Sequence, residues 1–413
     1  MKKINLAIGI SIGAVLASAV LISCKKETVQ AQQPASLSEP NLPAATYDYA
    51  SKHGVEGNLA TLGRVLFYDK NLSGNKTISC GSCHKQEYAF ADNVQFNKGA
   101  NGIALKRNSP SIQGIKGFRS EFSFFNTQNG TQVTSVVPGM PTKTNQTQVL
   151  LFWDGRQRSV SDMVLNPVLN HNEMNTPDLD QLVVNLGQLS YYPGLFKNAF
   201  GDAAITKERI SFALEGFLAC LNTTSLTVVD GDGTIPFSEF EGTANNNFIP
   251  PVSTAGDATL TPLERQGKFL FHSKYNCAQC HDPSNQGSYG TVTSPTQMFN
   301  IGLDEVYADK GLGALTHLPG DQGIFKVPTL KNISLTAPYM HDGRFANLGE
   351  VLDHYSHNIK ANANLSPKFL NVDGTPKKLN IQPAEKQALI AFLNTLKDDD
   401  FLTSPMYSDP FKK

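Results

Sequence analysis

The sequence predicts a mainly helical protein built from two related domains, and three observations predict this class. Two stretches of the chain repeat one helix-and-loop pattern, strand-like alternation of apolar and polar residues is scarce, and many Gly and Pro residues lie in the intervening loops. A chain of 413 residues also exceeds what one hydrophobic core usually fills. We therefore expect two helical domains joined by long loops.

The composition is that of an ordinary globular protein, with 40% hydrophobic and 17% charged residues. The formal net charge of −1 gives no reason to expect nucleic acid or anionic lipid as a partner. Six cysteines are too few for a disulfide-rich scaffold, so each one needs its own explanation.

The N-terminus has the pattern of an export signal. Lys2 and Lys3 precede an almost uninterrupted apolar run over residues 4–22, and the run ends in Leu21-Ile22-Ser23-Cys24, which resembles the lipobox of bacterial lipoproteins. A membrane-spanning helix and an ordinary cleaved signal peptide are the alternatives. We favour residues 1–24 as a lipoprotein signal with lipidated Cys24, followed by a flexible tether over residues 25–45 that is rich in Gln, Pro, Ala and Ser.

Each copy of the repeat begins with an amphipathic helix that leads into a loop with two cysteines. In the first copy GRVLF at 63–67 precedes CGSCH at 80–84, and in the second GKFLF at 267–271 precedes CAQCH at 277–281. Apolar residues upstream of the first loop keep helical spacing, at Leu59, Leu62, Val65 and Leu66. Upstream of the second loop, Thr261-Pro-Leu-Glu264 predicts a capping box with Pro in the first turn.

Each copy also ends in a predicted amphipathic helix, over residues 205–221 and 381–396. Phe217-Leu218 in the first corresponds to Phe392-Leu393 in the second, and Cys220 stands where the second copy has Thr395. We expect Cys220 to be a buried free thiol. The predicted limits are an N-terminal domain over residues 46–225, an insertion or linker over 226–259 and a C-terminal domain over 260–413.

The two CxxCH motifs predict covalent haem c in both domains. Two thiols separated by two residues can reach the two vinyl groups of one haem, and the next His is held as the proximal iron ligand. A zinc ribbon would need its cysteine pairs close together in sequence, and a thioredoxin motif needs no His after it. We assign haem attachment to Cys80 and Cys83 and to Cys277 and Cys280. We assign axial ligation of the two irons to His84 and His281.

Over about residues 58–398 the chain resembles the bacterial di-haem cytochrome c peroxidases and their MauG relatives. The resemblance is carried by the segments LGRVLF at 62–67, RNSP at 107–110, FWDGR at 152–156, Glu173-Met174 and TAPYMHDG at 336–343. It implies two cytochrome c-like helical domains, each with one haem. It also implies that the N-terminal haem reacts with peroxide and the C-terminal haem accepts and relays electrons.

The resemblance also implies roles for individual residues. Glu173 matches the acid–base carboxylate beside the peroxidatic iron, and a solvated loop Glu is the alternative. Trp153, the only tryptophan, matches the residue between the two haems, where core packing is the alternative. One calcium ion is expected between the domains, with Asn108, Thr336 and Pro338 as ligands.

Three departures from the family pattern bear on the mechanism. No His occurs between His84 and His171, and Ala100 stands near the position of the His that caps the peroxidatic haem in many relatives. Met163 replaces a distal-pocket glutamine. Tyr355 stands where many peroxidases have the axial Met of the C-terminal haem, as in MauG-like members. We predict Tyr355 as an axial ligand, with Met340, His354 and His357 as the alternatives.

The acidic segment from Asp230 to Phe240 resembles an EF-hand loop in part. Aligned on Gly233, however, its first ligand position is Val228, and Gly242 interrupts the expected exit helix. We therefore favour an ordinary acidic insertion.

The leading functional hypothesis is reduction of hydrogen peroxide to water with electrons from a small periplasmic donor, a cytochrome c or a cupredoxin. MauG-like oxidation of a protein substrate is the alternative enzyme hypothesis. A non-enzymatic electron carrier is the third, and Glu173 on an open haem face disfavours it. We expect the protein to be lipid-anchored on the periplasmic side of the bacterial outer membrane. The sequence is compatible with a monomer or a homodimer.

Overall fold

The computed structural model describes residue 40 and residues 57–114, 151–157, 159–221, 259–281 and 298–411. The predicted lipobox with Cys24, nearly all of the tether and nearly all of the 226–259 insertion lie outside these residues. Within them, no helix is long and apolar enough to cross a membrane.

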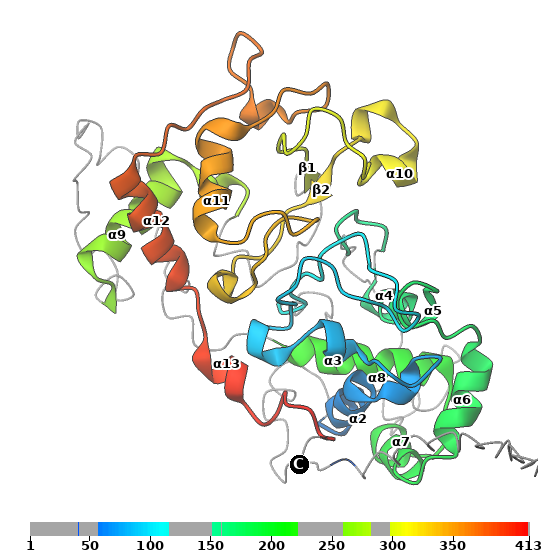
Figure 1. Ribbon diagram of the computed structural model, residues 1–413. Coiled ribbons are helices and arrows are strands. Elements are labelled where there is room, and N and C mark those ends of the chain that lie inside the picture. Colours follow the sequence, from blue (N-terminus) through cyan, green and yellow to red (C-terminus); the bar gives the residue numbers. More distant parts are fainter. Residues whose placement is uncertain are drawn as a thin grey trace, which may run out of the picture. The chain divides into compact units, whose positions relative to one another are not determined.

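The described chain is mainly helical, as predicted (Figure 1). Its first part contains α2 (Gly57–Tyr68), η1 (Lys70–Leu72), α3 (Cys80–Cys83), η2 (Gln86–Tyr88), α4 (Val160–Met163), α5 (Asn166–Leu169), α6 (Leu179–Gly187), α7 (Tyr192–Phe200) and α8 (Lys207–Cys220). Its second part contains α9 (Pro262–Phe269), η6 (Leu270–Lys274), η7 (Cys277–Gln279), α10 (Gly313–Thr316), η10 (Pro319–Asp321), η11 (Ile333–Leu335), α11 (Leu348–Asp353), η12 (His354–Asn358), η13 (Pro367–Phe369), α12 (Pro383–Asn394) and α13 (Asp399–Thr403). The sheet in the described residues is one antiparallel pair, β1 (Met298–Phe299) and β2 (Phe325–Lys326).

The predicted duplication appears as two equivalent helix pairs. Figure 1 shows α2 beside α8 and α9 beside α12. At each crossing a glycine lies against the partner backbone. A Cβ at Gly63 would lie 1.9 Å from Ala213 O, and a Cβ at Gly267 would lie 1.9 Å from Ala388 O. Because the glycine occupies the same place in both repeats, the sequence match corresponds to one packing geometry used twice.

Local sequence explains where these helices begin. Thr261 Oγ1 accepts the N–H of Glu264 at 3.3 Å, while Glu264 Oε2 accepts the N–H of Thr261 at 2.7 Å. The predicted capping box of α9 is therefore confirmed. The α8 helix begins after Thr206, whose hydroxyl accepts the N–H of Arg209, so it starts two residues inside the predicted range.

Two large hydrophobic clusters surround the two helix pairs. The first contains α2 and α8 and includes Cys220, which is fully buried as predicted; its Sγ lies 3.3 Å from Gly216 O. The second contains α12 and the end of the α9–η6 segment. Beyond α12 the chain returns to the first cluster, where Phe401 and Tyr407 are 3% and 5% exposed. The two-domain division itself stays a prediction.

Candidate active site

Both CxxCH motifs border one cavity of about 560 Å³. Cys80 and His84 line one part of it, and Cys277, Cys280 and His281 line another. Most of the remaining lining is apolar, including Phe67, Leu214, Phe271, Leu352 and Leu393. An apolar cavity that presents two cysteine–histidine motifs fits two bound haem groups, because the macrocycle is largely apolar and its attachment requires thiols and an imidazole.

The two attachment motifs have the same backbone hydrogen bond, from the N–H of the histidine to the carbonyl of the first cysteine. In the first, α3 brings Cys80 and Cys83 into one helical turn, and the N–H of His84 donates to Cys80 O at 2.9 Å. In the second, the N–H of His281 donates to Cys277 O, also at 2.9 Å. The turn places both thiols and the imidazole near each other, as attachment of one haem requires.

Each motif histidine is oriented by a backbone carbonyl. The Nδ1–H of His84 donates to Phe90 O at 2.9 Å, and that of His281 donates to Pro328 O at 3.3 Å. Burial lowers the pKa of His84 and lowers that of His281 to about 4, so both imidazoles are neutral near pH 7. With Nδ1 protonated, Nε2 carries the lone pair that an axial iron ligand needs.

Glu173 is half-buried near the first attachment motif. Asn170 Nδ2 donates to its carboxyl at 2.9 Å. Burial raises the pKa of Glu173, while the charge of Arg156 and the Asn170 hydrogen bond lower it; the net shift is upward. Burial also raises the pKa of Cys80 to about 12 and that of Cys83 to about 11, and Glu173 adds a smaller electrostatic contribution to both. The carboxyl is therefore within electrostatic reach of both attachment thiols.

The loop in which many relatives carry a capping histidine packs directly on the Glu173 backbone. The N–H of Ala100 donates to Glu173 O at 2.7 Å, and a Cβ at Gly99 would lie 1.9 Å from Asn172 O. His171 is exposed, with its Nδ1 2.8 Å from Asn175 Oδ1. It does not line the cavity, whereas Met163 does. Among the described residues, the histidines that line the cavity are His84, His281 and His341, and none of them comes from the loop around Ala100.

Trp153 connects segments from both repeats. Its indole N–H donates to Asn108 O at 2.9 Å, and its carbonyl accepts the N–H of Lys326 in β2 at 2.8 Å. The ring lines the cavity and packs at the edge of the small cluster formed by Leu303, Tyr307 and Phe325. The sole tryptophan is thus fixed between polypeptide segments that contribute to the two attachment regions.

The three predicted calcium ligands also lie along this cavity. Asn108 is buried, its N–H donates to His341 O at 2.8 Å, and its Nδ2 donates to Val94 O at 3.0 Å. Thr336 and Pro338 line the same cavity. The structure thus brings Asn108, from the first repeat, to the segment that contains the other two. Their role as calcium ligands stays a prediction.

Tyr355 lies in η12, a π-helical turn at the end of α11, and lines the cavity with Cys277, Cys280 and His281. Its ring stacks on Phe369 with centroids 5.8 Å apart. Burial raises the pKa of its phenol, with the second motif's thiols adding to the shift. π-Helical turns occur often at functional sites, because they displace a side chain from its α-helical position.

The alternatives to Tyr355 differ in position. Met340 also lines the cavity and has a positive φ of 75°. The Nε2–H of His354 donates to Ile301 O at 3.0 Å, and His357 is exposed; neither lines the cavity. Geometry therefore favours Tyr355 and Met340 over the two histidines.

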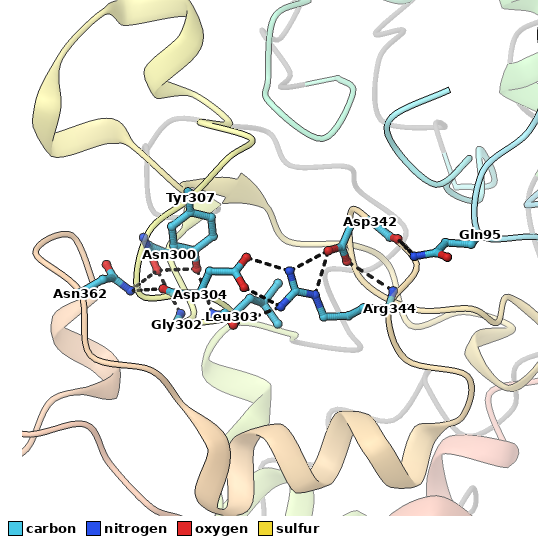
Figure 2. A network of polar contacts seen from close by, with 9 residues as sticks. All are labelled: Gln95, Asn300, Gly302, Leu303, Asp304, Tyr307, Asp342, Arg344 and Asn362. Carbon is cyan, nitrogen blue, oxygen red and sulfur yellow. Dashed lines mark hydrogen bonds and ion pairs between the residues drawn. The ribbon is translucent and has the colours of Figure 1, made fainter. Parts of the chain in front are cut away.

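A polar network supports the loop that carries Met340 and His341 (Figure 2). Arg344 forms two hydrogen bonds to the Asp304 carboxylate, at 2.9 and 2.7 Å, and its Nε donates to Asp342 at 2.8 Å. Gln95, from the first repeat, donates to Asp342 O at 2.9 Å. On the other side, Asn300 accepts the Tyr307 hydroxyl at 3.0 Å. Paired guanidinium–carboxylate bonds have a fixed geometry, so this network limits movement of the 339–345 loop.

Arg107 makes a second polar connection between the repeats. Its Nε and Nη2 donate to the Asp309 carboxylate at 2.6 and 2.8 Å, and its Nη1 donates to Asp154 at 2.6 Å. Asp154 also pairs with Arg156, whose charge lowers the pKa of Glu173. This chain of charges thus extends from Asp309 to the neighbourhood of the proposed acid–base residue.

Arg107 and Trp153 lie in motifs that are visible in the sequence. Their partners in the second repeat, Asp309 and Lys326, are not predicted by any sequence pattern. The same holds for the Phe90 and Pro328 carbonyls that orient the histidines. No sequence signal could have found these carbonyls, because every residue carries one and only tertiary packing selects among them.

Comparisons with known proteins agree with these features. Residues 57–241 match the family model described as di-haem cytochrome c peroxidase. The methylamine utilization protein MauG of Paracoccus denitrificans is 29% identical over 381 residues, covering 82% of this chain and 88% of the relative. A cytochrome c551 peroxidase of Nitrosomonas europaea is 27% identical over 347 residues, covering 83% and 80%.

Solved structures show the same architecture. The crystal structure of a MauG-like protein associated with microbial copper homeostasis aligns with a TM-score of 0.66 at 27% identity, covering 92% of this chain and 98% of that one. The di-haem peroxidase BthA of Burkholderia thailandensis, in its Y463M variant, aligns with a TM-score of 0.58 at 20% identity and supports the fold alone.

Proposed function

We propose that the chain is a member of the bacterial di-haem cytochrome c peroxidase and MauG family, and that it reduces hydrogen peroxide to water with electrons from a small redox protein. The observation that supports this most strongly is the half-buried Glu173, with its raised pKa, beside the first attachment motif. It lies next to a loop that contributes Ala100 where a capping histidine would otherwise be expected.

The family implies two haem groups, which Cys80, Cys83 and His84 and, in the second repeat, Cys277, Cys280 and His281 would hold. When bound, the first supplies the iron at which peroxide is reduced and the second supplies electrons to it. The apolar cavity limits water around both, which strengthens electrostatic interactions inside it.

Glu173 is the residue that moves the proton. Its carboxylate accepts a proton from the peroxide oxygen nearer the haem. It then gives this proton to the peroxide oxygen farther from the haem, which leaves as water. The complete reaction consumes one peroxide, two electrons and two protons and yields two waters. Asn170 orients the carboxyl, and the charge of Arg156 favours its ionised form, which can accept a proton.

Trp153 positions an easily oxidised ring between segments of both repeats, where it shortens the electron path. Two further assignments complete the proposal. A calcium ion held by Asn108 and the carbonyls of Thr336 and Pro338 would stabilise the contact between the repeats. A lipid on Cys24 would hold the protein on the periplasmic side of the outer membrane, where a cytochrome c or a cupredoxin can reach it.

MauG-like oxidation of a protein substrate is the second candidate, and Tyr355 is the observation that favours it. An anionic oxygen ligand stabilises ferric over ferrous iron, whereas a thioether raises the reduction potential. A haem bound by tyrosinate would be hard to reduce, and so a poor entry point for electrons from a high-potential cytochrome c.

The proposal is tested by adding peroxide to the fully ferric protein. We expect one high-spin haem in the EPR spectrum and direct reaction with peroxide, without prior reduction, because Ala100 would offer the first haem no ligand where many relatives have a capping histidine. A reduced cytochrome c or cupredoxin should then sustain peroxide consumption. A low-spin bis-histidine signal from this haem would contradict the open site. Reaction with peroxide that neither donor sustains would favour protein oxidation, and no reaction at all would favour an electron carrier.

A further inference from the structure

Two adjacent tyrosines share one buried carboxylate in the first repeat. Asp69, which follows α2, is fully buried, and its Oδ2 accepts the hydroxyls of Tyr191 at 2.8 Å and Tyr192 at 2.6 Å. Its Oδ1 accepts the backbone N–H and the side-chain amide of Asn71, each at 2.8 Å. Among the described residues, no Lys, Arg or His forms an ion pair with Asp69. Its charge is stabilised by four hydrogen-bond donors, two of them phenols.

This geometry makes Tyr192 a phenol with a proton acceptor already in place. Burial, followed by the charge of Asp69, raises the pKa of Tyr192 well above its ordinary value, so the phenol does not ionise near pH 7. One-electron oxidation, however, makes a phenol strongly acidic. The proton can then pass along the existing hydrogen bond to Asp69 with no rearrangement of either side chain.

The pair also lies close to the first haem-attachment motif. Asp69 directly follows Tyr68, whose ring packs against Gly81 between the two cysteines; a Cβ at Gly81 would lie 2.4 Å from that ring. Cys80 contributes to the raised pKa of Tyr192, which places the phenol within electrostatic reach of the attachment thiol. Oxidising equivalents formed at this motif therefore have a short path to Tyr192.

Tyr191 provides a continuation toward the surface. Its ring centroid is 4.7 Å from that of Tyr192, at an interplanar angle of 47°, and its own side chain is half-buried. Contacting aromatic rings are a favourable path for a single electron. Since both phenols donate to the same Oδ2, one carboxylate serves as proton acceptor for either of them.

We infer that Tyr192, Asp69 and Tyr191 form a second redox site, which carries oxidising equivalents from the peroxide-oxidised N-terminal haem to the protein surface. In the first step the O–H bond of Tyr192 breaks, its proton goes to Asp69 Oδ2 and its electron reduces the haem by one equivalent. In the second step Tyr191 donates an electron to Tyr192, which regains its proton from Asp69, and the proton of Tyr191 takes its place on the carboxyl. The oxidising power comes from hydrogen peroxide, so this inference rests on the proposed function.

The test is EPR of the di-haem protein frozen after mixing with peroxide, with ring-deuterated tyrosine to identify the signal. We expect a tyrosyl radical in the wild-type protein whose hyperfine structure narrows on deuteration. Tyr192→Phe and Asp69→Asn should abolish it. Tyr68→Phe is the matched control, because the Tyr68 hydroxyl donates to the carbonyl of Tyr407, which cannot take a proton; the radical should persist. Tyr191→Phe should leave a radical that an added water-soluble reductant removes more slowly.

Optical spectra of the same samples separate the two proposals. A haem spectrum that changes with peroxide while no tyrosyl signal forms would overturn this inference and leave the proposed function standing. Absence of both changes would overturn both. A tyrosyl signal that survives in Tyr192→Phe and decays as in the wild type in Tyr191→Phe would also overturn the inference, even if Asp69→Asn does not fold.

Discussion

At the scale of single residues, the active site depends on where each ionisable group is buried. Glu173 is half-buried beside one cation, and Tyr355 is held in an apolar cavity near the second attachment motif. In both, desolvation favours the protonated form, whereas the proposed role requires the ionised form. The proposed roles would therefore depend on partners, Arg156 for the carboxyl and an iron ion for the phenol.

Glu173→Gln should retain both haems and their spectra but lower the second-order rate with peroxide by about tenfold or more, since a positioned acid–base group contributes about 10²- to 10⁴-fold. Stopped-flow mixing with peroxide measures this rate. Glu87→Gln, three residues beyond His84 but exposed, is the matched control and should react as the wild type. An unchanged rate in Glu173→Gln would reduce Glu173 to a structural residue.

The same rate should depend on pH through Glu173. Because the carboxylate must accept a proton, the rate should fall as the pH drops through the raised pKa of Glu173. Arg156→Gln removes a positive charge that lowers this pKa, so the fall should move to higher pH. A pH profile of the peroxide reaction for both proteins checks the direction. A profile that shifts to lower pH in Arg156→Gln would contradict this electrostatic role.

Tyr355→Phe should change the low-spin signal of one haem only and raise the reduction potential of that haem, because an anionic ligand that stabilises ferric iron is lost. EPR and a spectroelectrochemical titration measure the two effects. Met340→Leu, at the other candidate position in the cavity, should leave both unchanged. A near-infrared sulfur-to-iron band in the wild-type protein would instead assign the ligand to methionine and strengthen the peroxidase hypothesis.

At the scale of secondary-structure elements, the two glycine crossings set how closely each helix pair approaches. Gly63 packs on Ala213 and Phe217, and Gly267 packs on Ala388 and Phe392. Residues of α2, α8 and α12 line the cavity, and α9 continues into η6, which precedes the second attachment motif. A change in helix separation would therefore reach the haem sites.

Gly63→Ala and Gly267→Ala should each destabilise the protein by about 1–3 kcal/mol, because the added methyl group meets a helix backbone that cannot move alone. Thermal unfolding of the purified variants measures the loss. Gly194→Ala, in α7 with nothing within 4 Å of the new Cβ, is the control and should be neutral or stabilising by about 0.5–1 kcal/mol. Equal effects in all three variants would show that the crossings are not tight.

At the scale of the whole molecule, residues near the C-terminus pack into the hydrophobic cluster around α2 and α8, about 340 positions earlier in the sequence. Tyr68 donates to Tyr407 O at 2.7 Å, and the Nε of the buried Arg64 donates to Ser408 O at 2.6 Å. Phe401 packs against Phe90, whose carbonyl orients His84. The C-terminal residues thus support the first attachment site, although they follow the last helix of the second repeat.

Phe401→Ala should therefore destabilise the first core by about 3–5 kcal/mol, the usual cost of removing a buried phenylalanine. Thermal unfolding followed through the spectrum of the first haem measures this. Val372→Ala, at a fully exposed position, is the control and should be within about 0.5 kcal/mol of the wild type. A selective effect on the second haem would contradict the placement of this segment.

The sequence alone predicted the helical class, the repeated helix-and-loop pattern, the capping box at Thr261 and the buried Cys220. These features depend on local spacing or on similarity between the repeats, which the chain carries in order. The prediction of haem attachment rests on the same kind of local pattern, since the residues of each CxxCH motif lie within five positions.

Only the tertiary structure decided which distant groups meet. It brought Asn108 to the carbonyl of His341, joined Arg107 to Asp309, placed Tyr355 in the cavity lining and His354 outside it, and set two phenols on Asp69. It also returned the C-terminal residues to the first core. Contacts of this kind leave no periodic trace in a single sequence, because any polar side chain or carbonyl can satisfy them and only packing selects the pair.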